Sequence, residues 1–174
     1  MDDVRLVDAF LDIKFDILSK DKMSFMREFE ILSKDSIDPI NEWVRHQKAN
    51  GNADETDKIL LNLIIELHKK VDFLTQKIEG KEEEKYLTLC QSSDIISIGY
   101  GYFKIKDQKF NENEIYYGRI SLPVFPQRLV PIVFVAKTKD TANITKISFS
   151  DEKDWDTYVS SREREIIREM KGTL

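Results

Sequence analysis

The spacing of apolar residues changes near residue 80. Before that point apolar residues recur mostly every three or four positions, which predicts helices, and after it they form short runs separated by polar turns, which predicts strands. Helical spacing returns between Trp155 and Met170. The pattern therefore predicts an α+β chain in three parts: an N-terminal helical region at 1–53, a long helix at 54–80, and an antiparallel β-barrel with a C-terminal helix at 81–174.

The first apolar segment fits two periods. Alternate positions from Leu11 to Ile17 are apolar, as in a strand, but Val7, Phe10 and Leu18 also fit one face of a helix. We favour a helix because no turn residue interrupts residues 3–18. A second short helix is expected around Phe25, Phe29 and Leu32. A third is expected from Asp38-Pro39, where an N-cap oxygen precedes a proline that needs no N–H partner, to Gly51.

The strongest periodicity lies in the long helix at 54–80. Its apolar positions are spaced four, three, four, three and four residues apart, which is the seam of a short heptad repeat. These positions are Leu60, Ile64, Leu67, Val71, Leu74 and Ile78. We expect homo-oligomer formation through residues 56–79, and the alternative is an amphipathic helix that packs on its own domain.

The strands of the barrel are predicted from apolar runs between polar turns. The runs are Tyr86–Leu89, Ile95–Ile105 with a break at Gly99 and Gly101, Ile115–Leu122, Val130–Val135 and Ile144–Phe149. Because no helix separates these runs, neighbouring strands should be antiparallel. In the C-terminal helix that follows, Trp155 and Tyr158 are expected to cap one open end of the barrel.

Composition and charge exclude several classes of protein. The 174 residues carry a formal net charge of -5, which argues against a nonspecific nucleic-acid coat. The single cysteine, Cys90, allows no internal disulfide, and with His46 and His68 far apart we expect no metal site. Cys90 is expected to be a buried, inert thiol within an apolar strand, and His68 a surface or seam residue rather than a general base.

Catalysis, membrane insertion and export are not expected. The sequence has no Walker-type phosphate loop, no nucleophile-elbow serine and no HExxH motif, so we expect no enzyme. No apolar run approaches the roughly 20 residues that span a bilayer. The N-terminus is acidic where a signal peptide would be basic. These features predict a cytoplasmic protein.

The order of strands and tail resembles a PilZ domain. The residues that carry the resemblance are Asp94–Phe103, Tyr117–Pro123, Ile132–Lys137, Ile144–Phe149 and Trp155–Glu165. The heptad segment around Lys69 and Lys70 resembles the helix that precedes the barrel in extended PilZ-like proteins. The resemblance covers about residues 56–171. It implies a bacterial signalling or adaptor protein of the flagellar, pilus or other motility machinery.

PilZ domains usually recognise cyclic di-GMP, and this sequence departs from their two binding motifs. The Arg-x-x-x-Arg element is matched only by Lys81 and Lys85, and a lysine cannot form the planar, bidentate fork that arginine offers to guanine. The Asp/Asn-x-Ser-x-x-Gly element is matched only by Asp94, Ser97 and either Gly99 or Gly101, with altered spacing in both cases.

We therefore expect no cofactor and favour a protein partner. Arg119 and Arg128 flank the loop at 123–126 and are candidate contacts for an acidic partner, although solvated arginines beside a loop are the simpler explanation. Two alternatives remain. One is a cyclic di-GMP receptor that uses the lysine-substituted site, and the other is a structural component of a cytoplasmic assembly.

Overall fold

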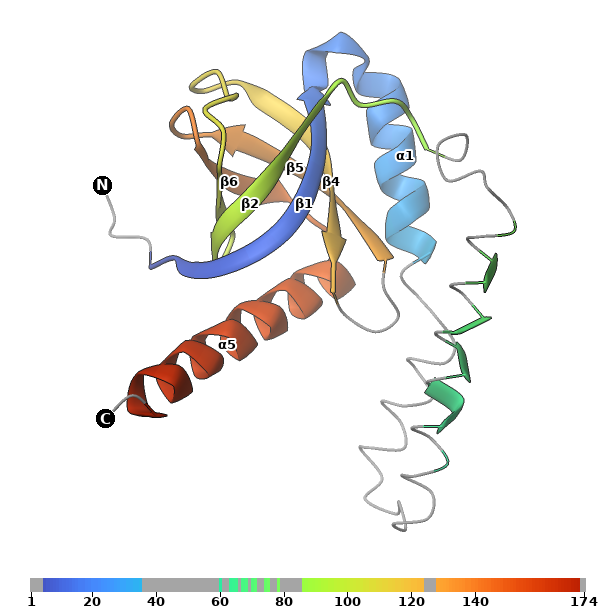
Figure 1. Cartoon of the computed structure of the whole chain (residues 1–174). Helices are drawn as coiled ribbons and strands as arrows, with labels where there is room; N and C mark the ends of the chain where they lie inside the picture. Colours follow the sequence, from blue (N-terminus) through green and yellow to red (C-terminus); the bar gives the residue numbers. More distant parts are fainter. Residues whose placement is uncertain are drawn as a thin grey trace. The chain divides into compact units, whose positions relative to one another are not determined.

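The computed structural model describes residues 5–35, 86–123 and 128–172, together with individual positions between 60 and 78. The chain forms two compact units, Met1–Ser36 with Leu89–Leu174, and Ile37–Thr88. The first unit contains six strands and two helices, shown in Figure 1. The strands are β1 (Val7–Ile17), β2 (Gln91–Gly99), β3 (Tyr102–Ile105), β4 (Ile115–Leu122), β5 (Arg128–Ala136) and β6 (Thr141–Lys146). The helices are α1 (Lys22–Asp35), which follows a 3-10 turn at Leu18–Lys20, and α5 (Phe149–Gly172).

The six strands close into an antiparallel barrel. The strand order is β1-β2-β3-β6-β5-β4, and β1 pairs with β4 to complete the circle. Closure pairs both sides of every strand, so the barrel offers no open sheet edge for strand addition by another chain.

The N-terminal segment forms strand β1, and the helix favoured from the sequence is wrong. Side chains alternate between buried and exposed along β1. Phe10, which the helical reading placed on the apolar face, is 80% exposed, whereas Ile13 and Phe15 are buried. Pairing with β2 and β4, both distant in sequence, selects the strand period. The barrel therefore begins at Val7 and is not confined to residues 81–174.

The other strands follow the predicted order with shifted bounds. The break predicted at Gly99 and Gly101 is a tight turn between β2 and β3, in which Gly101 has a φ of +73°, a conformation that glycine adopts without strain. The segment Tyr86–Leu89 is not a strand. Phe149, expected at the end of the last strand, instead begins α5.

Aromatic rings fill much of the barrel interior. Phe134 lies near the centre of this group: its ring stacks on Tyr116 at 5.4 Å and meets Phe103 edge-on at 5.1 Å between centroids. Phe15 and Phe110 pack against the same rings. Such offset and edge-on contacts are the favoured geometries for aromatic pairs.

Helix α1 covers the outer face of the barrel at β4 and β5 (Figure 1). Phe25 and Phe29 of α1 are buried, which confirms the predicted apolar stripe, and the Phe25 ring stacks on Tyr117 at 5.2 Å. Alternate residues of β4 thus face the barrel interior and the helix. This explains why nearly every position from Tyr116 to Leu122 is shielded from solvent.

Helix α5 lies across one end of the barrel (Figure 1). Trp155 and Val159 are 1% exposed and belong to the barrel core, and Tyr158 packs against the same core. The Trp155 indole N–H also donates a hydrogen bond to the carbonyl oxygen of Gly99, at 2.9 Å. The predicted capping role of Trp155 is confirmed.

The second unit is described only in part. The described positions between 60 and 78 all have helical backbone conformation, but they do not show one continuous helix over 54–80. The helix predicted from Asp38-Pro39 to Gly51 lies outside the described residues.

Candidate functional site

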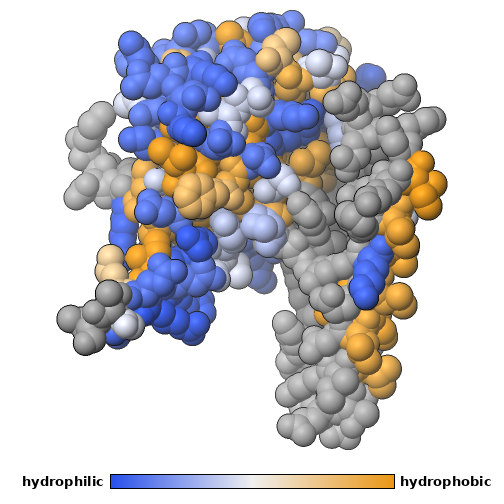
Figure 2. Space-filling view, in the orientation of Figure 1, coloured by the Kyte–Doolittle hydropathy of each residue, from blue (hydrophilic) through white to orange (hydrophobic). Residues whose placement is uncertain are grey.

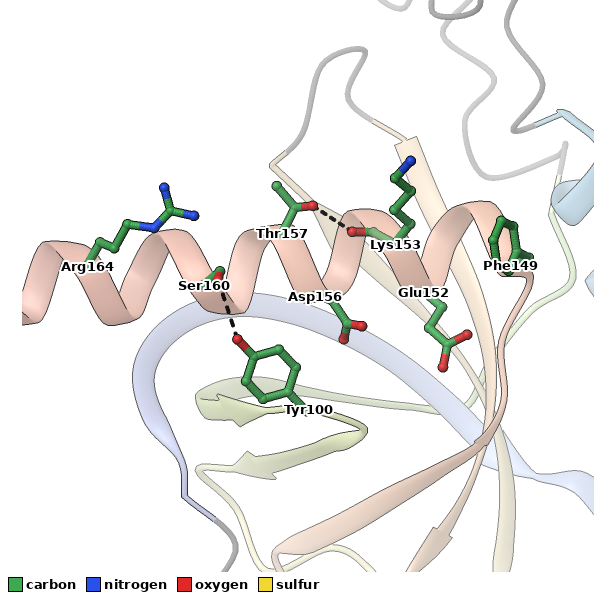
Figure 3. Close-up of a pocket in the computed structure, with 8 residues that line it drawn as sticks. All are labelled: Tyr100, Phe149, Glu152, Lys153, Asp156, Thr157, Ser160 and Arg164. Carbon is green, nitrogen blue, oxygen red and sulfur yellow. Dashed lines mark hydrogen bonds between the residues drawn. The ribbon is translucent and has the colours of Figure 1, made fainter. Parts of the chain in front are cut away.

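An open cleft lies between α5 and the turn that joins β2 to β3. Its volume is about 490 Å³. Figure 3 shows the lining residues: Tyr100, Phe149, Glu152, Lys153, Asp156, Thr157, Ser160 and Arg164. All except Tyr100 lie on α5, so the placement of this helix determines the shape of the cleft.

The N-terminal end of α5 is fixed by a capping arrangement. The Ser148 hydroxyl donates to the Asp151 carboxylate at 2.6 Å, and the Asp151 backbone N–H donates back to the Ser148 hydroxyl oxygen at 3.2 Å. This reciprocal pair defines where the helix begins. Together with the buried Trp155, one turn further on, it holds the cleft residues in place.

Two carboxylates face the same side of the cleft. Glu152 and Asp156 are four residues apart on α5, where like charges repel. Burial raises the pKa of Asp156, and the neighbouring Glu152 carboxylate adds to this effect. Neither carboxylate forms an ion pair or hydrogen bond within the described part of the chain. In Figure 3 both point toward the side on which Tyr100 lies, whereas Lys153 and Arg164 extend in the opposite direction. All four side chains line the cleft, so two cations lie along its other edge.

Two aromatic side chains flank these carboxylates. Phe149 is 85% exposed at the start of α5, and Tyr100 is 52% exposed in the β2–β3 turn. The Tyr100 hydroxyl lies 3.4 Å from the Ser160 hydroxyl (Figure 3) and 3.5 Å from Oε2 of Glu163, which are long hydrogen bonds, so the Tyr100 side chain itself is held against the helix only weakly. The cleft therefore combines exposed aromatic surface with two carboxylates on the side of Tyr100 and two cations, Lys153 and Arg164, along the other edge.

The sequence analysis did not identify this cleft. Its residues come from a turn and from a helix far along the chain, so no short motif contains them. One local signal was present: two carboxylates at helical spacing, of which Asp156 lies beyond the first helical turn, where the helix dipole no longer favours negative charge.

The residues predicted for cyclic di-GMP are only partly described. Lys81 and Lys85 lie outside the described residues. Asp94 is exposed on β2 and pairs across the sheet with Asp12 of β1, which is also exposed. Ser97 is half-buried. The structure thus places a second carboxylate, rather than a cation, beside Asp94.

Gly99 has a structural role in the barrel. A Cβ at this position would lie 2.7 Å from the backbone oxygen of Arg5 and 3.0 Å from the Leu6 side chain. The glycine therefore allows the start of the chain to approach β2 closely. In PilZ domains the glycine of this element lets a ligand come close to the strand. At Gly99 the corresponding space is filled by the backbone of Arg5.

Arg119 is not a surface contact for a partner. It is 6% exposed, and its guanidinium Nη1 lies 2.7 Å from Oε2 and 2.9 Å from Oε1 of Glu28 on α1. Arg119 is thus neither a contact for an acidic partner nor the solvated arginine that was the simpler explanation, because α1 covers this face of β4. Arg128 begins β5, and its side chain lies outside the described residues.

The six seam positions of the second unit are described and exposed. Leu60, Ile64, Leu67, Val71, Leu74 and Ile78 are between 48% and 82% exposed. Figure 2 shows their apolar surface along the described positions of this segment. His68, expected at the surface or in the seam, is half-buried there.

Cys90 is exposed, and the expectation of a buried thiol is wrong, because Cys90 precedes β2 rather than lying within a strand. A hydrogen bond with the Asp16 carboxylate, and then its negative charge, raise the pKa of the thiol. A raised pKa disfavours the thiolate, so Cys90 lacks the activation that a nucleophilic cysteine needs.

Within the described residues, no group of three or more His, Cys, Asp and Glu side chains is placed to hold a metal ion. No described helix combines the length and apolar character needed to cross a bilayer. No protein-family model, curated protein or solved structure matches the chain.

Proposed function

We propose that this protein is a non-catalytic adaptor whose barrel docks a protein partner in the cleft along α5. The observation that carries the proposal is the combination in this cleft of two exposed aromatic rings, Phe149 and Tyr100, with two carboxylates, Glu152 and Asp156, that have no described ion pair. Exposed aromatic side chains are enriched where proteins bind one another.

The two carboxylates on the Tyr100 side of the cleft favour a basic segment of the partner there. An Arg or Lys side chain placed between Glu152 and Asp156 would relieve their mutual repulsion, and its aliphatic stem would pack on Phe149 or Tyr100. A phosphate placed on that side would instead meet the two carboxylates. A short peptide segment suits the open shape of the cleft better than a small ligand does, because ligand pockets enclose most of the ligand surface.

The cellular context rests on the resemblance to PilZ domains. A closed six-stranded antiparallel barrel followed by a helix supports this resemblance at the level of architecture. On that basis we place the adaptor in the bacterial cytoplasm, in flagellar, pilus or other motility machinery. A structural component of a cytoplasmic assembly would share the barrel but would have no need of the cleft.

Self-association through residues 56–79 is the second part of the proposal. The exposure of all six seam residues supports it, since monomeric proteins rarely leave so extended an apolar surface uncovered. Two copies of the barrel in one particle would strengthen binding to a partner that presents repeated segments.

The cleft is tested by affinity capture from the native cell with quantitative mass spectrometry. The baits are the full chain and its Phe149→Ala/Glu152→Gln/Asp156→Asn variant. The matched control is Phe10→Ala/Asp12→Asn/Glu112→Gln, which removes another exposed ring and two exposed carboxylates away from the cleft. We expect at least one partner that the wild-type and control chains retain and the cleft variant loses. Equal partner sets for all three baits would contradict a docking role for the cleft.

A further inference from the structure

The six apolar seam residues of the second unit indicate how many copies of the chain associate and in which direction their helices run. The described positions from Leu60 to Ile78 have helical backbone conformation. The Thr75 hydroxyl donates a hydrogen bond to the carbonyl oxygen of Val71, one helical turn earlier, at 2.9 Å. We infer that this segment forms a parallel, in-register, two-stranded coiled coil with a second copy of this chain. The inference rests on the proposed self-association and adds its stoichiometry and direction.

The residue types at the seam favour two strands. Spacing of four, three, four, three and four assigns the leucines Leu60, Leu67 and Leu74 to the d positions of the heptad. It assigns the β-branched residues Ile64, Val71 and Ile78 to the a positions. β-branched residues at a with leucine at d favour the parallel dimer, because each fits the packing geometry of its own layer there. Leucine at a with isoleucine at d would favour four strands instead.

The charges beside the seam favour the parallel direction. Lys70 is exposed and lies at a g position. In a parallel, in-register pair, each g residue faces the e residue five positions further on in the partner copy, so Lys70 meets the uncharged Thr75. The antiparallel pair that buries the same six apolar residues is centred at position 69. It would bring Lys70 against the Lys70 of the second copy, and like charges so placed repel.

The occupant of the seam is therefore a second copy rather than an unrelated helix. All six apolar side chains are at least about half exposed, from 48% at Ile64 to 82% at Ile78. In the parallel register each a and d residue meets its own counterpart, so the surface is complementary to itself along its whole length. Leu63, which is 63% exposed at the neighbouring g position, widens the apolar surface on one side.

Stoichiometry is tested with the full chain by sedimentation equilibrium at tens of micromolar protein. We expect a single species of twice the 20.4 kDa chain mass. A monomer, trimer or tetramer would overturn the inference. Leu67→Glu/Val71→Glu should convert the dimer into a monomer whose barrel still unfolds cooperatively, whereas Met23→Glu, at an 83% exposed position on α1, should remain dimeric. Exchanging all leucines at d for isoleucine and all a residues for leucine should shift the mass toward four chains.

Direction is tested by disulfide cross-linking in a Cys90→Ser chain. Leu74→Cys faces its own counterpart only in a parallel pair, so this single variant should form a disulfide-linked dimer. In an antiparallel pair position 74 faces position 64. A mixture of Leu74→Cys and Ile64→Cys chains that cross-links mainly between unlike chains would refute the parallel direction.

The two proposals fail separately. A monomeric wild-type chain that still captures a partner through the cleft would remove the coiled coil and leave the adaptor function in place. A dimer whose cleft variant captures the same partners as the wild type would do the reverse.

Discussion

Glu28 and Arg119 form a buried ion pair that fixes α1 to the wall of the barrel. Their side chains are 9% and 6% exposed, and the closest contact between the guanidinium and the carboxylate is 2.7 Å. The Tyr117 hydroxyl donates a further hydrogen bond to the same carboxylate, at 2.7 Å. Burial, and then the Glu28 carboxylate, raise the pKa of Tyr117, so the phenol stays a donor at all ordinary pH values. The pair thus joins two elements that are distant in sequence.

Loss of one partner from this pair should destabilise the fold strongly. Glu28→Ala leaves the Arg119 guanidinium and the Tyr117 hydroxyl without the carboxylate that they contact. Breaking a buried pair in this way costs about 3–5 kcal/mol, because a buried charge loses the carboxylate that it contacts. The double variant Glu28→Met/Arg119→Met removes both charges and should be clearly more stable than the single variant. Urea unfolding, monitored by circular dichroism, measures the free energy of unfolding of both variants. An equal decrease in the two variants would contradict this account.

This pair also shows where sequence patterns stop being informative. Its two residues are 91 positions apart, and nothing in the local sequence distinguishes Arg119 from a solvated arginine. The elements around the pair were largely predictable: the strands near β4 and β5 and the helix with Phe25 and Phe29 follow from periods of two and of 3.6 residues. Which face a charged residue occupies depends on tertiary packing.

Strand β1 illustrates the same limit in the fold. Its apolar residues fit both a strand and a helix, and no turn residue decides between them. The strand is selected by pairing of Val7 with Ile98 and of Ile13 with Ile120, which are contacts between distant segments. The cleft was missed for a related reason, since Tyr100 meets α5 only once the barrel has closed.

Asp16 should make the stability of the barrel depend on pH at the acid end. Burial by itself raises the pKa of this carboxyl group. Hydrogen bonds from Lys20, the Cys90 thiol and the Ile17 and Cys90 backbone N–H groups outweigh burial and lower the pKa to about 2. The ordinary value is 3.8. The stabilisation is therefore fully present above about pH 5 and is lost as the pH falls toward 2.

The expected size of this effect is about 2 kcal/mol. Asp16→Asn should be less stable than the wild type by about that amount at neutral pH, and the difference should shrink as the pH falls from 5 to 2. Urea unfolding across this range measures it, with the exposed Asp12→Asn as control. If the free energies of unfolding of the wild type and Asp16→Asn differ by the same amount at every pH down to 2, Asp16 is not the titrating group.

Substitution of Gly99 should disturb the junction between the start of β1 and the end of β2. Gly99→Ala places a methyl group 2.7 Å from the Arg5 carbonyl oxygen, closer than real Cβ contacts come. The strand must shift, at an expected cost of about 1–3 kcal/mol. Gly172→Ala is the matched control, because a Cβ there meets nothing within 4 Å. Thermal unfolding compares the two variants, and equal midpoints would mean that Arg5 moves away freely.

Cyclic di-GMP should not bind to this chain with saturable heat. The Arg5 backbone occupies the open side of Gly99, and Asp94 lies opposite Asp12, so these counterparts of the PilZ motif offer a blocked glycine and two carboxylates to an anionic ligand. Only Gly101, the other candidate glycine, is open, since a Cβ there would meet nothing within 4 Å. The resemblance puts Lys81 and Lys85 where PilZ domains have arginines, and lysines there would leave phosphate attraction without guanine recognition. Isothermal titration of the full chain is the measurement, with a guanine-free cyclic dinucleotide as control ligand. Heat that saturates for cyclic di-GMP alone and disappears in Lys85→Ala would establish the receptor instead, whereas weak heat shared by both ligands and abolished by salt would reflect phosphate attraction only.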